Sequence, residues 1–134
     1  MPARTSGGHR WNWRSTSKLL SANTERPRAR RSDGMIVEVA RIRAREGAAD
    51  ALEAGLCRAR GVISRAEGYR GSAFHRGIED PGEFILTIWW DSVDHHMKGF
   101  REGPLFPDWR AAFAEHMAPP PVVAHYTTFV GEAP

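Results

Sequence analysis

The strongest constraint on the fold is the order in which strand and helix periodicities follow one another from residue 35 onward. Residues 35–44, MIVEVARIRA, alternate between two faces, and one of these faces carries Ile36, Glu38, Ala40 and Ile42. Residues 46–68 space their apolar side chains by four and three positions, which is the period of an amphipathic helix ending at Gly68. The first two elements are therefore a strand and a helix.

The next two segments predict a hairpin. Residues 69–76 and 83–90 are rich in aromatic and β-branched side chains, which favour strands. They flank GIEDPG, whose aspartate, proline and glycine are turn formers. The two strands should therefore be antiparallel neighbours.

The rest of the chain predicts two helical segments and a last strand. Residues 91–100 have helical spacing after Asp91 or Ser92 as the N-cap, and residues 103–117 repeat the helical signal. The proline run APPP should end that helix, because proline cannot continue one. Residues 122–130, VVAHYTTFV, are β-branched and aromatic, as in a strand.

The resulting order, β-α-β-β-α-β, predicts an α+β fold of the ferredoxin-like type. In that fold a four-stranded antiparallel sheet carries its helices on one face. The second face has no cover within the chain, and several apolar side chains lie on one face or the other: Val37, Val39, Phe74, Ile85 and Trp89. An uncovered apolar sheet in so small a domain favours a homodimer.

The charge of the chain is concentrated in its first segment. Residues 1–34 contain eight Lys and Arg but two acidic residues, a net charge of +6, whereas the remainder carries −3. We expect residues 1–34 to be a disordered basic tail and residues 35–131 to be the folded domain. Met35 is an alternative translation start, and a competing interpretation is a nucleic-acid or membrane arm in which Trp11 and Trp13 would stack or insert.

Several classes of protein are excluded or disfavoured by what the sequence lacks. A single cysteine, Cys57, permits no intrachain disulfide and no Cys-based zinc site, and it fits a reduced cytoplasmic setting. No apolar run is long enough to span a bilayer. Neither a G-x-G-x-x-G motif nor a P-loop occurs, so we expect no nucleotide or flavin cofactor. Because the excess of basic charge lies in residues 1–34, we expect no nucleic-acid binding by the folded domain.

The sequence from residue 35 to 131 resembles the antibiotic biosynthesis monooxygenase family. The resemblance is carried by four segments: MIVEVARIRAREG, EGYRGSAFHRGIEDPGEFILTIWWDS, FREGPLFPDWR and PPVVAHYTTF. It implies a dimeric α/β barrel and an activity among quinol and anthrone oxygenases or haem degraders. An oxygenase of this kind would act without a cofactor, because the deprotonated substrate itself reduces O2. The alternative is a small-molecule binder, cyclase or isomerase of the same fold.

The haem-degrading branch of that family uses an Asn, a Trp and an axial His. Alignment on the quoted segments places Ala40, Gly99 and Trp109 at those three positions. Haem degradation is therefore disfavoured.

The adjacent pair His95 and His96 suggests a metal site at first sight. Neighbouring residues on a helix point about 100° apart, so the two rings cannot hold one ion together. We expect no metal site.

Candidate site residues follow from strand parity and from the family resemblance. Glu38 is of interest because a buried carboxylate often does acid–base work, although a salt bridge with an arginine is the alternative. The candidate bases are His96 and His125, and His96 is preferred. His96 could face either a cavity or water, and the alternative for His125 is a structural, hydrogen-bonded histidine. The residues expected to line an aromatic substrate cavity, or to form core, are Ala40, Trp90, Phe100, Trp109 and Phe113. We interpret His75, Arg76 and His116 as surface or structural residues.

Overall fold

The computed structural model describes residues 35–134, so the predicted basic tail lies outside the described residues. The elements in chain order are β1 (Ile36–Ala44), α3 (Ala49–Ile63), β2 (Tyr69–Arg76), β3 (Glu83–Trp90), the π-helical turn η2 (His95–Phe100), α4 (Phe106–Phe113), the 3-10 turn η3 (Ala114–His116) and β4 (Met117–Tyr126). The predicted order of strands and helices is confirmed, and the β2–β3 hairpin has the predicted bounds.

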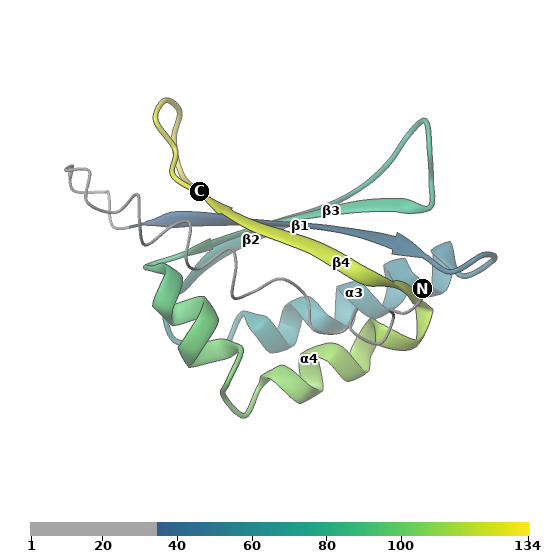
Figure 1. Cartoon of the computed structure of the whole chain (residues 1–134), viewed down its shortest axis with the longest axis horizontal. Coiled ribbons are helices and arrows are strands. Elements are labelled where there is room, and N and C mark those ends of the chain that lie inside the picture. The colour runs from purple at the N-terminus through teal and green to yellow at the C-terminus, as the bar shows by residue number, and fades with distance from the viewer. Residues whose placement is uncertain (1–34) are drawn as a thin grey trace.

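The four strands form one antiparallel sheet in the order β2-β3-β1-β4. Both helices lie on one face of this sheet, with η2 beside them (Figure 1). This is the predicted ferredoxin-like arrangement. It puts β1 in the interior of the sheet and β4 at its edge. Within residues 35–134, no helix is both long and apolar enough to cross a membrane.

The last strand differs from the prediction. It spans Met117–Tyr126 instead of residues 122–130, and it includes the proline run that was expected only to end a helix. Proline lacks the N–H that a central strand must donate, but an edge strand has one side without a neighbour. Because β4 is an edge strand, it accommodates the prolines, with a register shift against β1 between Arg41 and Arg43.

The helical segments are also shorter than predicted. The first helix spans Ala49–Ile63, and residues 91–100 contain the six-residue π turn η2 instead of a continuous α-helix. The helix predicted over residues 103–117 divides into α4 and the turn η3.

Alternation along the strands separates a core face from an outer face. Glu38, Ala40 and Trp90 lie on the helix side as predicted, and Phe74 joins them because its ring contacts Trp109 edge to face. The outer face carries Val37, Val39, Ile85 and Trp89. These residues are either paired across β1 and β3 or separated by an even number of positions along one strand. The core thus sits between the sheet and the two helices.

Close approach of α3 and α4 depends on Gly55. A Cβ atom at this position would collide with the Ala112 carbonyl and would lie 3.2 Å from the Phe113 Cβ. The absent side chain lets the helices pack tightly over the sheet. Leu52, Leu56 and Ile63 on the same helix are at most 2% exposed, and burial of each contributes about 1.5–3 kcal/mol.

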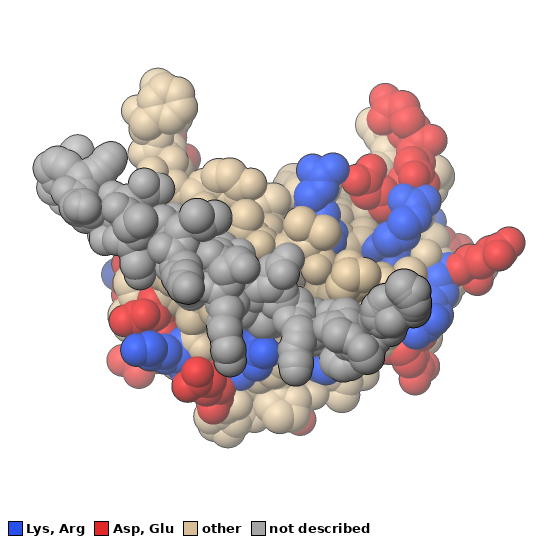
Figure 2. Space-filling view, in the orientation of Figure 1, with Lys and Arg blue, Asp and Glu red and all other residues tan. Residues whose placement is uncertain are grey.

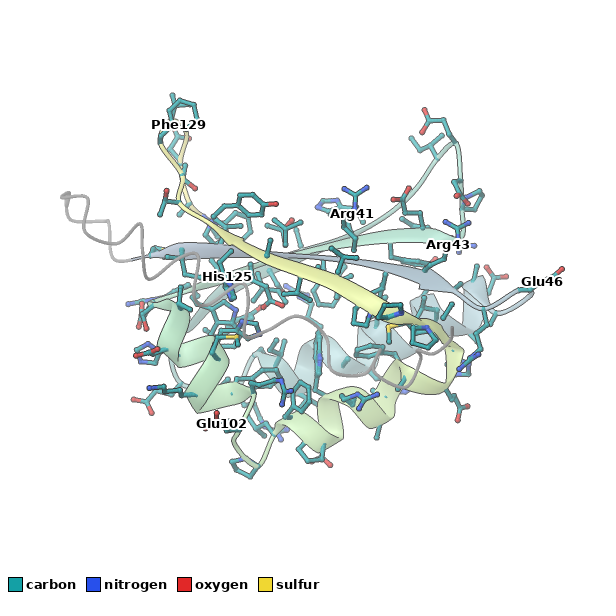
Figure 3. All side chains as sticks on the ribbon, viewed as in Figure 1. Arg41, Arg43, Glu46, Glu102, His125 and Phe129 are labelled. Atoms are coloured by element: carbon teal, nitrogen blue, oxygen red, sulfur yellow. The ribbon has the colours of Figure 1, made fainter. Side chains whose placement is uncertain are left out.

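Two projections rise from the outer face, one at each end of the sheet (Figure 1). One is the turn between β2 and β3, and the other is the segment that follows β4. Phe129, at 95% exposed, stands at the tip of the second projection (Figure 3).

Candidate active site

Three predicted site residues from different parts of the chain meet on the core face. Antiparallel pairing of β1 with β4 sets Glu38 directly opposite His125. His96 reaches the same place from η2, on the helix side of the sheet. Figure 3 shows His125 on that side and Arg41 on the outer side. We refer to Glu38, His96 and His125 as the buried cluster.

Glu38 is 3% exposed and holds two polar partners on a single oxygen. The indole Nε1–H of Trp90 donates to Glu38 Oε1 at 2.9 Å, and His96 Nε2 lies 3.4 Å from the same atom. Among the described residues, no arginine pairs with this carboxylate, so the predicted alternative of an Arg salt bridge is wrong. A buried carboxylate needs such partners, because it has lost its hydration.

His96 is 1% exposed, which excludes the alternative in which it faces water. Its ring stacks on Trp90, with centroids 5.2 Å apart and planes inclined by 22°. The N–H of Arg101 bonds to the His96 carbonyl five residues back, as in a π turn, and the two buried residues of this turn are His96 and Phe100.

His96 and His125 are joined by a short hydrogen bond. Nδ1 of His96 lies 2.8 Å from Nε2 of His125, so one nitrogen donates and the other accepts. The remaining ring nitrogen, Nδ1 of His125, is buried and has no hydrogen-bond partner among residues 35–134. His125 as a whole is 6% exposed.

Burial shifts the pKa of all three groups. It raises the pKa of Glu38 from 4.5 to about 7, although the Trp90 hydrogen bond acts in the opposite direction. It lowers the pKa of His125 to about 4. The pKa of His96 falls well below its ordinary value, first through burial and then through the charges of His125 and Arg101. Near pH 7 both histidines are therefore neutral, while the carboxyl group is close to half protonated.

An aromatic wall continues from the buried cluster into the core. Phe100 lies 5.6 Å from Trp90 and 5.8 Å from Trp109, and Trp109 lies 5.1 Å from Phe113, all as ring-centroid distances. These are the four aromatic residues predicted to line a cavity or form core. Each is at most 6% exposed, as is Ala40 on β1. The structure brings all five to the same side of the sheet as the buried cluster.

Sequence reasoning missed Arg101 and the polar role of Trp90. The Arg101 guanidinium lies 5.0 Å from the centre of the Phe106 ring, and its charge lowers the pKa of His96. Its position five residues after His96 carries no recognisable signal, because α-helical spacing does not align positions five apart. Strand parity predicts that Trp90 and Glu38 lie on the same face of the sheet. It does not predict the orientation of the indole, on which the hydrogen bond to Glu38 depends.

The other polar residues lie outside the cluster. His95 diverges from His96 and contacts Ser92 Oγ through Nδ1 at 2.8 Å. His75 is exposed, Arg76 pairs with Asp50 and Glu53, and His116 lies 3.4 Å from Glu115. No group of three or more His, Cys, Asp or Glu in the described part of the chain is arranged to hold a metal ion.

Comparison with known proteins places the chain in a family. The family model described as antibiotic biosynthesis monooxygenase matches residues 35–117. A crystal structure of a Bordetella bronchiseptica protein assigned to the antibiotic biosynthesis monooxygenases is 40% identical, covers 72% of this chain and 99% of that protein, and has a TM-score of 0.69.

Two further relatives are more distant. YczJ of Bacillus subtilis, an uncharacterised protein, is 26% identical over 92 residues, which are 69% of this chain and 97% of YczJ. A mutant of SnoaB, a cofactor-independent oxygenase from Streptomyces nogalater, is 15% identical, covers 73% of this chain and 96% of that protein, and has a TM-score of 0.63. At that identity SnoaB supports the fold alone.

Proposed function

The chain belongs to the antibiotic biosynthesis monooxygenase family, and we propose that it is a cofactor-independent monooxygenase of an aromatic, quinol-type or polyketide-like small molecule. The observation that carries the proposal is the buried cluster beside an aromatic wall: two neutral imidazoles joined by a hydrogen bond, and a carboxyl group whose oxygen lies 3.4 Å from His96 Nε2. Such a set of groups is suited to removing a proton from a planar, weakly acidic substrate.

The proposed reaction requires a proton acceptor, because the deprotonated substrate itself supplies the electrons that reduce O2. A phenol or anthrone that loses a proton becomes an electron-rich anion, which transfers one electron to O2. The two radicals combine into a peroxide, and loss of water leaves a carbonyl where the substrate carried a CH2 group. O2 is reduced, the carbon is oxidised by four electrons, and one oxygen atom leaves as water.

The protein would contribute three effects to this chemistry. The buried cluster would accept the first proton near neutral pH, at a rate benefit of about 10² to 10⁴. The aromatic wall of Trp90, Phe100 and Trp109 would bind a flat ring system and exclude water from the anion. The charge of Arg101 would favour the negative charge that develops on oxygen.

The decisive experiment records O2 uptake with a panel of anthrones and quinols. We expect at least one compound to consume one O2 per carbonyl formed, and His96→Asn to lose most of that rate. His95→Ala is the matched control, because the neighbouring histidine contacts Ser92 and lies outside the cluster. Turnover of a panel compound without O2 uptake would contradict the proposal and assign the chain to the cyclases or isomerases of this fold.

We also propose that the protein acts as a homodimer through its outer sheet face. Val37, Val39 and Ala124 lie on this face, and Val122 and Tyr126 on β4 are 55% and 53% exposed. Figure 2 shows mostly uncharged surface on the projection after β4 and acidic side chains on the turn between β2 and β3. The apolar part of the outer sheet face, which lies between the two projections and beside Arg41 and Arg43, is suited to receiving a second copy.

A further inference from the structure

The geometry points to His125 as the residue that takes the substrate proton, with His96 as a relay and Glu38 as the place where the proton is stored. This inference rests on the proposed function, since it supplies the path for the proton that the oxygenase must remove. It assigns three different roles to three groups that the sequence offered as alternative bases.

The first argument is that Nδ1 of His125 is the end of the series of contacts that joins Glu38, His96 and His125. His125 Nε2 contacts His96, whereas Nδ1 is buried without a partner among the described residues. A buried ring nitrogen without a partner is unfavourable, and a hydrogen bond to a bound hydroxyl group would offset that cost. His125 is also on the edge strand β4, whereas Glu38 is on the interior strand β1. The series therefore runs from the sheet interior to its edge.

The second argument comes from the positions of the ring protons. When Glu38 is ionised, its oxygen can accept a hydrogen bond from His96 Nε2–H. His96 Nδ1 then carries no proton and must accept a hydrogen bond from His125 Nε2–H. Each neutral imidazole has one N–H. His125 Nδ1 then carries a lone pair and no proton, which is the state of a general base.

The transfer can be written with every proton accounted for. The substrate O–H or C–H proton moves to His125 Nδ1, and the His125 Nε2 proton moves to His96 Nδ1. The His96 Nε2 proton then moves to Glu38 Oε1, and the Trp90 N–H continues to donate to that oxygen. The electron pair of the broken bond stays on the substrate, both imidazoles are neutral again, and Glu38 is neutral. The 3.4 Å contact between His96 and Glu38 must shorten slightly for the last step.

The order of basicities drives the proton inward. Glu38 has the highest pKa of the three, about 7, while the pKa values of both histidines are depressed by burial. The groups around them are Trp90 from β3 and Arg101 after η2, whose charge further disfavours an imidazolium at His96. Tyr69 of β2 packs edge-on against Trp90, and its hydroxyl contacts Ser72. A proton received at the edge therefore ends on the carboxylate.

Nitrogen-15 NMR of the imidazole rings in the full chain tests this arrangement without any substrate. Between pH 5 and 9 we expect His96 and His125 to keep one ring proton each. That proton should be on Nδ1 of both rings at low pH and on Nε2 of both rings at high pH, with one shared midpoint near pH 7. Loss of the resonances in His96→Asn and His125→Gln assigns them.

Glu38→Gln is the matched variant for the NMR experiment. Its amide oxygen can accept from Trp90 and His96 at all pH values, so both rings should stay protonated on Nε2 throughout. The inference is overturned if the wild-type rings do not change tautomer, change with separate midpoints, or gain a second proton in this range.

Kinetics with any compound found by O2 uptake separates the role of His125 from that of a structural residue. His125→Gln keeps an amide near the position of Nε2 but has nothing at Nδ1, so kcat should fall by about 10² or more while the fold is retained. Activity within threefold of wild type would refute a role for Nδ1. If no panel compound consumes O2, the proposed function fails, whereas the relay is still decided by the tautomer measurement.

Discussion

Replacement of Glu38 by Gln should make the protein more stable at high pH, although it removes the proposed proton store. The side chain is 3% exposed, and burial raises its pKa from 4.5 to about 7. A carboxyl group whose pKa is raised by folding binds its proton more tightly in the folded state. Its contribution to stability is complete below pH 4.5 and is lost as pH rises through 7.

The magnitude follows from the pKa difference. At 1.36 kcal/mol for each unit of pKa difference, ionised Glu38 lowers the free energy of unfolding by about 3 kcal/mol relative to the protonated form, and most of this loss falls between pH 5 and pH 8. Gln has nearly the shape of protonated Glu and can accept the Trp90 hydrogen bond. Wild type and variant should therefore be similar at pH 5, and the variant should be more stable at pH 8.

Urea unfolding at pH 5 and pH 8, followed by tryptophan fluorescence and circular dichroism, measures both free energies. The two histidines contribute to the pH dependence of each protein, and their contribution cancels to first order in the difference. If Glu38→Gln is destabilised equally at both pH values, Glu38 is ionised and well paired in the folded state, and the reasoning about its burial is wrong.

Four further predictions test the packing, the cluster, the assembly and the ligand class. Gly55→Ala should lower stability by about 1–3 kcal/mol in denaturant unfolding, because its methyl group meets the facing helix, whereas Gly61→Ala has open space and should be neutral or stabilising by up to about 1 kcal/mol. Trp90→Phe removes a hydrogen bond that lowers the pKa of Glu38, so the midpoint of the histidine tautomer change should rise above about 7; an unchanged midpoint would exclude that bond. Sedimentation at micromolar concentration should show a dimer that Val39→Asp dissociates, and a wild-type monomer would contradict the assembly. Titration with haem should give no saturable His-ligated Soret band, since the resemblance to the haem-degrading branch aligns Trp109 with the His of that branch.

Strand parity made part of the site predictable. Glu38 and Trp90 each lie on a short strand whose alternation is regular, so their common side of the sheet followed from the sequence. The pairing of Glu38 with His125 did not follow. It depends on the register between the first and last strands, which are far apart in the chain and are aligned by tertiary packing.

Two local features explain the other differences. A run of three prolines normally ends regular structure, and only the edge position of β4 makes it compatible with a strand. The sequence does not decide the orientation of His96, because the segment after Trp90 has an α-helical period in the sequence but forms a π turn. The π turn inserts one additional residue per turn, and this changes which side chains of the segment face the core.

A purely structural role does not account for the buried cluster. Glu38 could be replaced by Gln with the Trp90 hydrogen bond kept and with less loss of stability at neutral pH, and His96 and His125 are both held neutral at a desolvation cost. The free energy of unfolding of small domains is only about 5–15 kcal/mol, so the loss of about 3 kcal/mol on ionisation of Glu38 is a large fraction of it. What Gln cannot do is gain and lose a proton near pH 7. This difference supports the proposed role of the carboxyl group in proton transfer, because catalytic sites commonly retain groups that lower stability.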